Sequence, residues 1–138
     1  MKKIVEKIAV AGVLVKDDKA LIIQRAADDD YMPELWEIPS GKREPEESTA
    51  LWVKREVEEE IGIKVEVGEP IGSFKYKVEK PDETRNVTQI CFLVKPIGED
   101  NVKLSSEHQD FAWITEGEID KYNITEETKE IIRKALKL

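Results

Sequence analysis

Three glutamates lie close together on one side of a predicted helix. At 100° per residue, Glu56, Glu59 and Glu60 fall within an arc of roughly 100°, whereas Glu58 points elsewhere. Like charges this close on a helix cost roughly 0.2–0.5 kcal/mol per pair, and the helix dipole disfavours carboxylates near the C-terminal end. A divalent cation would reverse this effect, because Mg²⁺ and Mn²⁺ prefer clustered oxygen ligands. The three side chains alone fit either a metal site or a solvated acidic face.

The residues around these glutamates follow a longer pattern that favours the metal site. Reading from Gly41, the spacing is G-x5-E-x7-R-E-U-x-E-E-x-G-U, in which U is an aliphatic residue. The specified positions are Gly41, Glu47, Arg55, Glu56, Val57, Glu59, Glu60, Gly62 and Ile63. Every one of them matches the signature of the Nudix hydrolases. The chain therefore resembles that family, and the segments that flank the pattern resemble its MutT-like members.

The resemblance implies a role for each charged residue on the helix. Glu59 and Glu60 are expected to be the principal metal ligands. Glu56 is expected to be either a further ligand or the general base that deprotonates water. Arg55 is expected to hold Glu56 in place by a charge-assisted hydrogen bond.

The resemblance also assigns residues in the loop before the helix and at its end. Glu47 is expected to support the junction between loop and helix, and Gly41 is a structural residue of the motif. Gly62 is placed to end the helix in the left-handed conformation. The residue before Gly41 is Ser40, whose backbone carbonyl is expected to be a metal ligand.

A further carboxylate lies near the C-terminal end of the chain. Glu107-His108-Gln109, with Trp113 six residues after Glu107, resembles the loop that supplies one more carboxylate in MutT-like proteins. Glu107 is therefore expected to be a metal ligand or the general base, and the sequence does not choose between Glu56 and Glu107 for the base. His108, the single histidine, is expected at the surface.

Three residues outside the pattern are expected to bind substrate. Arg25 ends a predicted strand and resembles a phosphate contact of MutT-like proteins, and Lys42 lies in the motif loop within reach of phosphate. Ile38, together with Trp36, flanks the expected site and would line a nucleobase pocket.

The expected chemistry is hydrolysis of a phosphoanhydride. Bound metal ions neutralise phosphate charge and lower the pKa of water. The resemblance implies Mg²⁺, for which Mn²⁺ can substitute, and a nucleoside triphosphate, oxidised forms included, which water converts to the monophosphate and pyrophosphate. Members that read oxidised guanine carry an asparagine near the start of the last helix. Here Thr128 stands at the closest register and Asn123 lies earlier, which counts against that specificity.

Two other functions are open on the sequence. One is hydrolysis of ADP-ribose or a nucleotide sugar, although members with that preference carry a proline where this chain has Val78. Tyr76 likewise falls short of the position expected for hydrolases of dinucleoside polyphosphates. The other function is that of a catalytically inactive Nudix module, which senses a nucleotide or binds a partner. Such modules usually lose a motif glutamate, and this chain keeps all of them.

Hydrophobic patterning predicts the elements that would position these residues. Strands are expected at residues 4–15, 20–25, 63–67, 71–78, 87–94 and 111–114, and helices at 48–61 and 125–138. Segment 26–42 is expected to be a loop with a short extended piece at 36–38. The order indicates an α/β (α+β) fold and, with the resemblance, a Nudix-type α/β/α sandwich with a mixed β-sheet.

Two details of the helices also follow from the sequence. The apolar stripe of the first helix is expected to consist of Ala50, Val53, Val57 and Ile61. Asn123, with Glu126 three residues later, is expected to cap the second helix.

Length and composition exclude several classes of protein. The 138 residues suit a single domain, 1–138, and one cysteine, Cys91, excludes an internal disulfide. The net charge of −8 argues against a nucleic-acid polymer as partner. No apolar run is long enough to span a membrane, and the start lacks the apolar stretch of a signal peptide. We expect a cytoplasmic monomer or homodimer whose partner is a small-molecule nucleotide.

Overall fold

The computed structural model describes residues 2–42 and 48–138. In chain order the elements are β1 (Lys3–Lys16), β2 (Lys19–Arg25), β3 (Trp36–Glu37), β4 (Ser40–Lys42), α1 (Thr49–Ile61), β5 (Val65–Glu79), β6 (Glu83–Pro96), β7 (His108–Ile114), the 3₁₀ helix η1 (Glu116–Lys121) and α2 (Glu126–Leu136). Within these described residues, no helix has the length and apolar character needed to cross a membrane.

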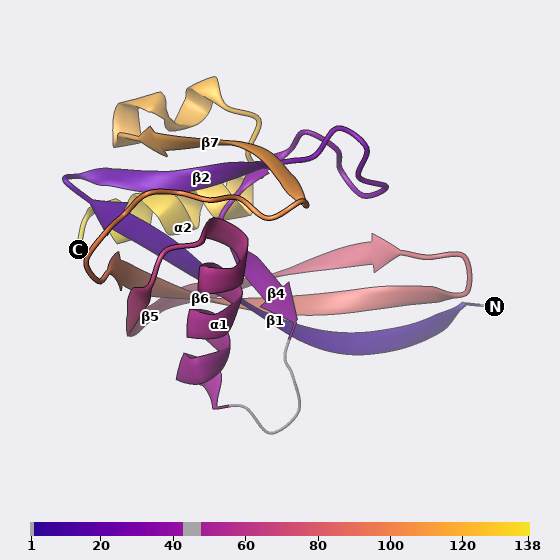
Figure 1. Cartoon of the computed structure of the whole chain (residues 1–138). Coiled ribbons are helices and arrows are strands. Elements are labelled where there is room, and N and C mark those ends of the chain that lie inside the picture. Colours follow the sequence, from indigo (N-terminus) through magenta and orange to yellow (C-terminus); the bar gives the residue numbers. More distant parts are fainter. Residues whose placement is uncertain (1, 43–47) are drawn as a thin grey trace.

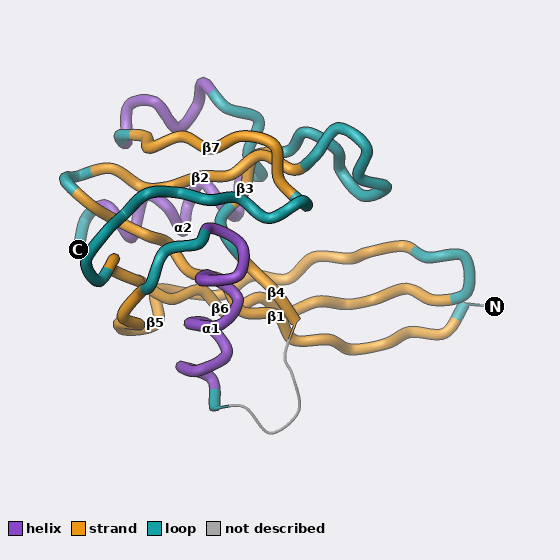
Figure 2. Tube along the Cα trace, viewed as in Figure 1, coloured by secondary structure: helices purple, strands orange, loops and turns teal. Residues whose placement is uncertain are grey.

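The strands form one mixed sheet in the order β3-β2-β1-β6-β5, with β4 paired to β1 and β7 paired to β2. β1 runs parallel to β6 from Lys3 to Leu14. The remaining pairs are antiparallel. Figures 1 and 2 show that β1, β5 and β6 continue beyond the helices, with the N-terminus near the far end of this extension. We call residues 3–8, 75–79 and 83–88 the arm.

Alternate residues of β1 and β2 contribute to two hydrophobic cores, one on each face of the sheet. The first core joins α1 to the sheet through Val10, Leu14, Leu21, Ile23, Trp52, Val53, Val57 and Ile61. The second joins α2 to the sheet through Ala11, Val13, Ala20, Ile22, Ile131, Ile132 and Ala135. The two helices therefore cover opposite faces (Figure 1). This is the α/β/α sandwich with a mixed sheet that the sequence predicts.

Two expected features of the helices are wrong in detail. Ala50 is exposed and Trp52 takes its place in the buried stripe, because the first turn of α1 lies outside the interface with the sheet. The cap of α2 is Thr125 and not Asn123. The Thr125 hydroxyl accepts a hydrogen bond from the Thr128 N–H at 3.3 Å, whereas the Asn123 carbonyl accepts one from Trp36 at 3.0 Å.

Two expected features of the strands also differ. Residues 40–42, expected within a loop, form β4 and pair with Ala9–Ala11 of β1. The two strands expected at 63–67 and 71–78 are one strand, β5, whose pairing with β6 shifts register between Val67 and Gly72. In the sequence, the residues around Pro70 look like a boundary between two strands. In the structure they form an irregularity within one strand, because β5 pairs with β6 on both sides of it.

Candidate active site

The last turn of α1 is joined to the loop that carries Glu107. Gly62 ends the helix with φ +68°, as predicted, and donates its N–H to the Glu58 carbonyl at 2.9 Å. The Lys103 N–H donates to the Ile61 carbonyl at 2.8 Å, and the Ser105 N–H donates to the Glu60 carbonyl at 3.2 Å. Helix-end carbonyls have no partner within the helix. The loop satisfies two of them and so places Glu107 beside the motif glutamates.

One pocket gathers most of the residues expected to do chemistry. Its lining consists of Arg25, Ser40, Gly41, Lys42, Glu56, Glu59, Glu60, Ser105 and Glu107. All five residues expected as metal ligands are in this set, as are Arg25 and Lys42. We call it the carboxylate pocket. Glu47 lies outside the described residues, so its expected role is a prediction on which the structure is silent.

Arg55 and Gly41 together hold Glu56. Arg55 Nη1 lies 2.8 Å from Glu56 Oε1, which is the contact expected from the sequence, and 3.5 Å from both carboxylate oxygens of Glu59. A Cβ atom built on Gly41 would lie 1.9 Å from Glu56 Oε2. Only glycine therefore lets β4 pass this close to the carboxylate. Burial raises the pKa of Glu56 above its usual value.

Glu60 is the most deeply buried carboxylate of the pocket, with 8% of the residue exposed. Its Oε1 accepts a hydrogen bond from the Ser40 N–H at 2.6 Å. Burial, together with the charges of Glu37, Glu107 and Glu56, raises the pKa of Glu60 to about 9. In the metal-free protein the side chain is thus neutral at pH 7. A cation beside it would favour the ionised form.

His108 is buried, so the expectation of a surface histidine is wrong. Its side chain is 1% exposed, with Nε2 2.8 Å from Glu37 Oε2 and Nδ1 3.5 Å from Glu60 Oε2. β7 begins at His108 and pairs with β2, which turns the ring inward between two carboxylates. The sequence places His108 in a polar loop and gives no sign of this pairing.

Arg25 lines the carboxylate pocket but also makes ion pairs within the protein. Its guanidinium lies 2.7 Å from Asp29 Oδ2 and 3.2 Å from Glu37 Oε2, and its Nε donates to the Tyr31 carbonyl at 3.0 Å. The Glu37 carboxylate therefore contacts both Arg25 and His108. These contacts fix the guanidinium at the rim of the pocket, where a phosphate could share it with the carboxylates.

The chemistry of the donors in the carboxylate pocket fits a divalent cation. Glu56, Glu59, Glu60 and Glu107 supply hard oxygen ligands from two chain segments. Ser40 has no positive φ, so its backbone adopts ordinary β geometry beside them. Among residues 2–42 and 48–138, no three His, Cys, Asp or Glu side chains converge closely enough to hold a metal ion as they stand. The carboxylates of Glu56 and Glu59 instead turn toward Arg55.

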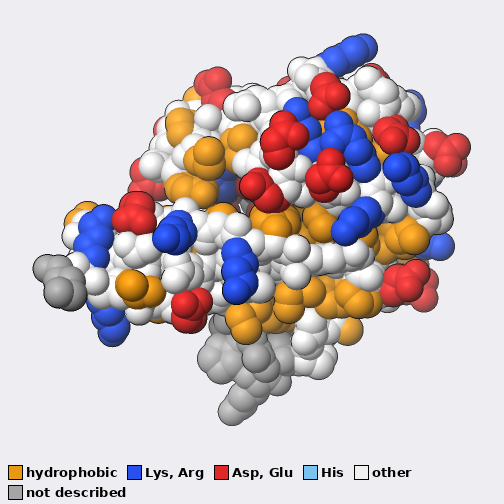
Figure 3. All heavy atoms as spheres, turned by 180° about the vertical axis from the view of Figure 1, so that it is seen from behind, with side chains coloured by type: hydrophobic (Ala, Val, Ile, Leu, Met, Phe, Trp, Pro, Cys, Tyr) orange, Lys and Arg blue, Asp and Glu red, His pale blue; other side chains and the backbone are white. Residues whose placement is uncertain are grey.

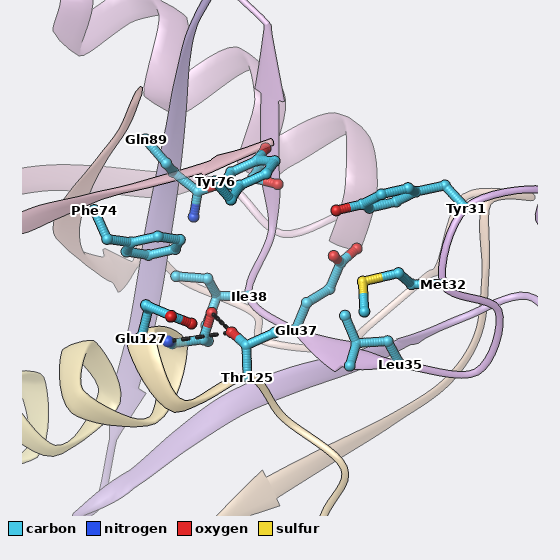
Figure 4. Close-up of a pocket in the computed structure, with 12 residues that line it drawn as sticks. Tyr31, Met32, Leu35, Glu37, Ile38, Phe74, Tyr76, Gln89, Thr125 and Glu127 are labelled. Atoms are coloured by element: carbon cyan, nitrogen blue, oxygen red, sulfur yellow. Dashed lines mark hydrogen bonds between the residues drawn. The ribbon is translucent and has the colours of Figure 1, made fainter. Parts of the chain in front are cut away.

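A second pocket adjoins the first and has the character of a nucleobase site. Its lining consists of Tyr31, Met32, Leu35, Glu37, Ile38, Ser40, Phe74, Tyr76, Gln89, Thr125, Glu127 and Thr128. Figure 4 shows the Phe74 and Tyr76 rings close to Ile38, with Gln89 and Glu127 at the same end of the pocket, whereas Tyr31, Met32 and Leu35 lie at the opposite end. Aromatic walls with a few polar groups suit a planar base. We call it the base pocket.

Ile38 lines the base pocket, and its role in binding a base stays a prediction, whereas several other residues of the base pocket were not predicted. Trp36 packs instead against Tyr122, with ring centroids 5.0 Å apart. Thr128 lines the pocket and Asn123 does not. Gln89 could have been predicted from the sequence, because a polar residue within the mainly apolar segment 87–94 needs a buried partner or a ligand. Phe74 and Glu127 could not have been predicted from the sequence, because their positions depend on how β5 and α2 pack.

The family follows from comparison with known proteins. The sequence model of the NUDIX domain matches residues 6–135. The chain belongs to the Nudix family. This Nudix hydrolase is 37% identical over 114 residues to a MutT-like protein of Streptomyces ambofaciens, an alignment that covers 83% of this chain and 67% of that protein.

Two further likenesses agree with this assignment. The CTP pyrophosphohydrolase of Escherichia coli (strain K12) is 42% identical over 69 residues, so the alignment covers 50% of each protein. The crystal structure of a MutT protein from Methanosarcina mazei Go1 has a TM-score of 0.80 at 25% identity and covers 98% of this chain and 95% of that chain. The fold and the family of this Nudix hydrolase are therefore those that the sequence predicts.

Proposed function

We propose that this Nudix hydrolase is a Mg²⁺-dependent pyrophosphohydrolase that converts a nucleoside triphosphate and water to the monophosphate and pyrophosphate. The observation that carries the proposal is the junction of the two pockets at Ser40, which lines both. A nucleotide whose base occupies the base pocket would extend its phosphates along β4 into the carboxylate pocket. The relation to a CTP pyrophosphohydrolase supports the same class of substrate.

In this proposal the residues of the carboxylate pocket divide between metal binding and proton transfer. Glu59, Glu60, Glu107 and the Ser40 carbonyl would hold Mg²⁺, which when bound neutralises phosphate charge and acidifies water. Glu56 serves as the general base in preference to Glu107. Burial raises the pKa of Glu56 above its usual value, and Arg55 fixes its carboxylate at 2.8 Å. A base works best when its pKa lies near the working pH.

Arg25 and Lys42 would contact the phosphates, and Ile38 would form part of the surface under the base. Arg25 reaches the pocket already oriented by Asp29 and Glu37. Orientation of this kind lowers the entropic cost of holding the phosphate chain. The cytoplasmic location, the single domain 1–138 and the monomeric or homodimeric state are further expectations of the proposal.

The test is a panel of substrates with Mg²⁺: the common ribo- and deoxyribonucleoside triphosphates, 8-oxo-dGTP, ADP-ribose and nucleotide sugars. We expect one or more triphosphates to give monophosphate and pyrophosphate at the highest kcat/KM. Glu59→Gln should abolish turnover. The matched control Glu58→Gln should keep it, because Glu58 faces Lys54 and Val65 and lies outside the carboxylate pocket.

Three results would contradict the proposal in different ways. A clear preference for ADP-ribose or a nucleotide sugar would show that the substrate class is wrong. Nucleotide binding without turnover of any phosphoanhydride would indicate an inactive module. Full activity of Glu59→Gln would show that the carboxylate pocket is not the catalytic site.

A further inference from the structure

A third pocket lies on the arm and is lined mainly by cations. Its charged lining residues are Lys7, Arg25, Asp30, Lys42, Lys80 and Arg85. Tyr31 and Tyr76 also line it, and both belong to the base pocket as well. Five cations and one carboxylate surround this pocket in a chain whose net charge is −8. We call it the basic pocket.

Strand register explains how residues so distant in sequence meet there. In the paired strands of the arm, Lys7 of β1 lies opposite Val87 of β6, which in turn lies opposite Tyr76 of β5. One pleat further along, Arg85 lies opposite Val78. Side chains alternate between the faces of a sheet, so these residues share one face. Lys75 and Lys77 point to the other face, where they line a separate hollow with Glu6 and Asn86.

The three lysines of the basic pocket are uncompensated within the described residues, whereas its two arginines are paired: Arg25 contacts Asp29 and Glu37. Lys7, Lys42 and Lys80 make no ion pair with any residue in the described part of the chain, whereas Arg85 contacts Glu83 at 2.6 Å. Like charges gathered in this way repel one another, and a polyanion placed between them would reverse the effect.

The basic pocket is continuous with the carboxylate pocket, because Arg25 and Lys42 line both. An anion that leaves the carboxylate pocket along Lys42 therefore comes next to Lys7, Lys80 and Arg85. Figure 3 views the molecule from behind, where several Lys and Arg side chains lie along the arm and others lie among acidic side chains.

We propose that Lys7, Lys80 and Arg85 form a subsite for the terminal phosphate of the substrate, beyond the two phosphates joined by the bond that is cleaved. The proposal rests on the proposed function and narrows it to nucleotides that carry three or more phosphates. A diphosphate-linked sugar places a neutral ring where the third phosphate would lie, and it offers Lys7, Lys80 and Arg85 no anion. Specificity for triphosphates then arises on the arm, outside the Nudix motif.

The test compares two double variants that remove the same charge from the same arm. Lys7→Gln/Lys80→Gln removes two cations of the subsite, and Lys75→Gln/Lys77→Gln removes two from the opposite face. For the best triphosphate, the first variant should raise KM on the order of tenfold with little change in kcat, because partly exposed charge contacts are individually modest. The control should stay within about twofold of the unmodified enzyme.

Two further readouts separate binding of the terminal phosphate from a general loss of charge. The preference for the triphosphate over the diphosphate of the same nucleoside should fall in Lys7→Gln/Lys80→Gln and not in the control. The increase of KM with ionic strength should also become shallower in that variant alone. Equal melting temperatures of the two variants would show that both are folded.

Equilibrium binding of inorganic tripolyphosphate in EDTA distinguishes failure of this inference from failure of the proposed function. If no nucleotide is hydrolysed but tripolyphosphate binds and Lys7→Gln/Lys80→Gln weakens it, the subsite stands and the proposed function falls. Turnover of triphosphates with an unchanged KM and unchanged tripolyphosphate binding in that variant overturns the subsite. A strong preference for 5′-triphosphorylated RNA over free nucleotides, lost in the same variant, also overturns its assignment to a small molecule.

Discussion

Nε2 of His108 lies 2.8 Å from Oε2 of Glu37, and this contact joins the base pocket to the carboxylate pocket. Glu37 lines the base pocket, whereas the other ring nitrogen of His108 faces Glu60 in the carboxylate pocket at 3.5 Å. The histidine therefore lies between one carboxylate of each pocket. Because His108 is buried between two acidic side chains, its replacement should lower the free energy of unfolding as well as the activity.

We predict that His108→Phe destabilises the protein by about 1–3 kcal/mol, because the partly buried Glu37 carboxylate loses one of its partners and keeps Arg25. Denaturant unfolding of the metal-free protein measures this. His108→Gln, which can still donate to Glu37, should lose less. Equal stabilities of the two variants would show that the contact with Glu37 contributes nothing to the fold.

The raised pKa of Glu60 predicts that the metal-free protein loses stability as pH rises. The folded-state pKa is about 9 against a usual value of 4.5, so the folded state holds a proton that the unfolded state releases between these pH values. Stability is greatest below pH 4.5 for this group alone and falls until pH exceeds about 9. Bound Mg²⁺ displaces the proton, so apparent Mg²⁺ affinity should rise over the same range.

Melting temperatures in EDTA at several pH values test this prediction. Glu60→Gln should flatten the decline between neutral and alkaline pH. The pKa of Glu58 is lowered because Lys54 and the Val65 N–H contact its carboxylate, so this group stabilises the protein less as pH falls. Glu58→Gln should therefore change the dependence of stability on pH at acidic pH only, and it should leave the decline at alkaline pH as it is. A decline that is unchanged in Glu60→Gln would show that this carboxyl does not hold the proton.

Gly41→Ala should inactivate the enzyme without unfolding it. The new Cβ would overlap Glu56 Oε2 at 1.9 Å, and the long glutamate side chain can move away. A displacement of about 1 Å at a catalytic group can cost on the order of a hundredfold in rate. Gly117→Ala is the matched control, because a Cβ there meets nothing within 4 Å. Wild-type kcat in Gly41→Ala would show that Glu56 need not occupy its observed position.

Phe74→Leu should weaken nucleotide binding through loss of a stacking surface. Stacking of a base on an aromatic ring contributes about 1–3 kcal/mol, so KM should rise at least about fivefold. Leucine keeps the apolar contact that Phe74 makes with the core next to α2. Binding of tripolyphosphate, which has no base, should be unchanged. An equal loss for nucleotide and tripolyphosphate would indicate that the residue acts through the fold.

The sequence predicted the motif helix and its carboxylates well, because their arrangement is local. Glu56, Glu59 and Glu60 share a helical face through their spacing alone. Gly62 ends the helix because glycine readily adopts the left-handed conformation. Resemblance added Glu107, which the loop then brings to the same pocket. Physical patterning alone would have left it as a charged loop residue.

The sequence failed where the site depends on contacts between distant segments. His108 meets Glu37 only because β7 pairs with β2 while β3 pairs with the other edge of β2. Lys7 and Arg85 share a face only because β1 runs parallel to β6 in one particular register. Both residues look like ordinary solvent-facing charges when each strand is considered separately. The register that joins them is a property of the whole sheet.

The hydrogen bonds from Lys103 and Ser105 to the last turn of α1 have a consequence for folding as well as for catalysis. The segment that carries Glu107 cannot detach without also exposing the helix-end carbonyls next to Glu60. A divalent ion shared by Glu60 and Glu107 would act as a non-covalent cross-link between them, and it would stabilise the native state by an amount that grows with the logarithm of its free concentration. Slowed hydrogen exchange at these two amides would then report metal occupancy directly, with no need for a substrate.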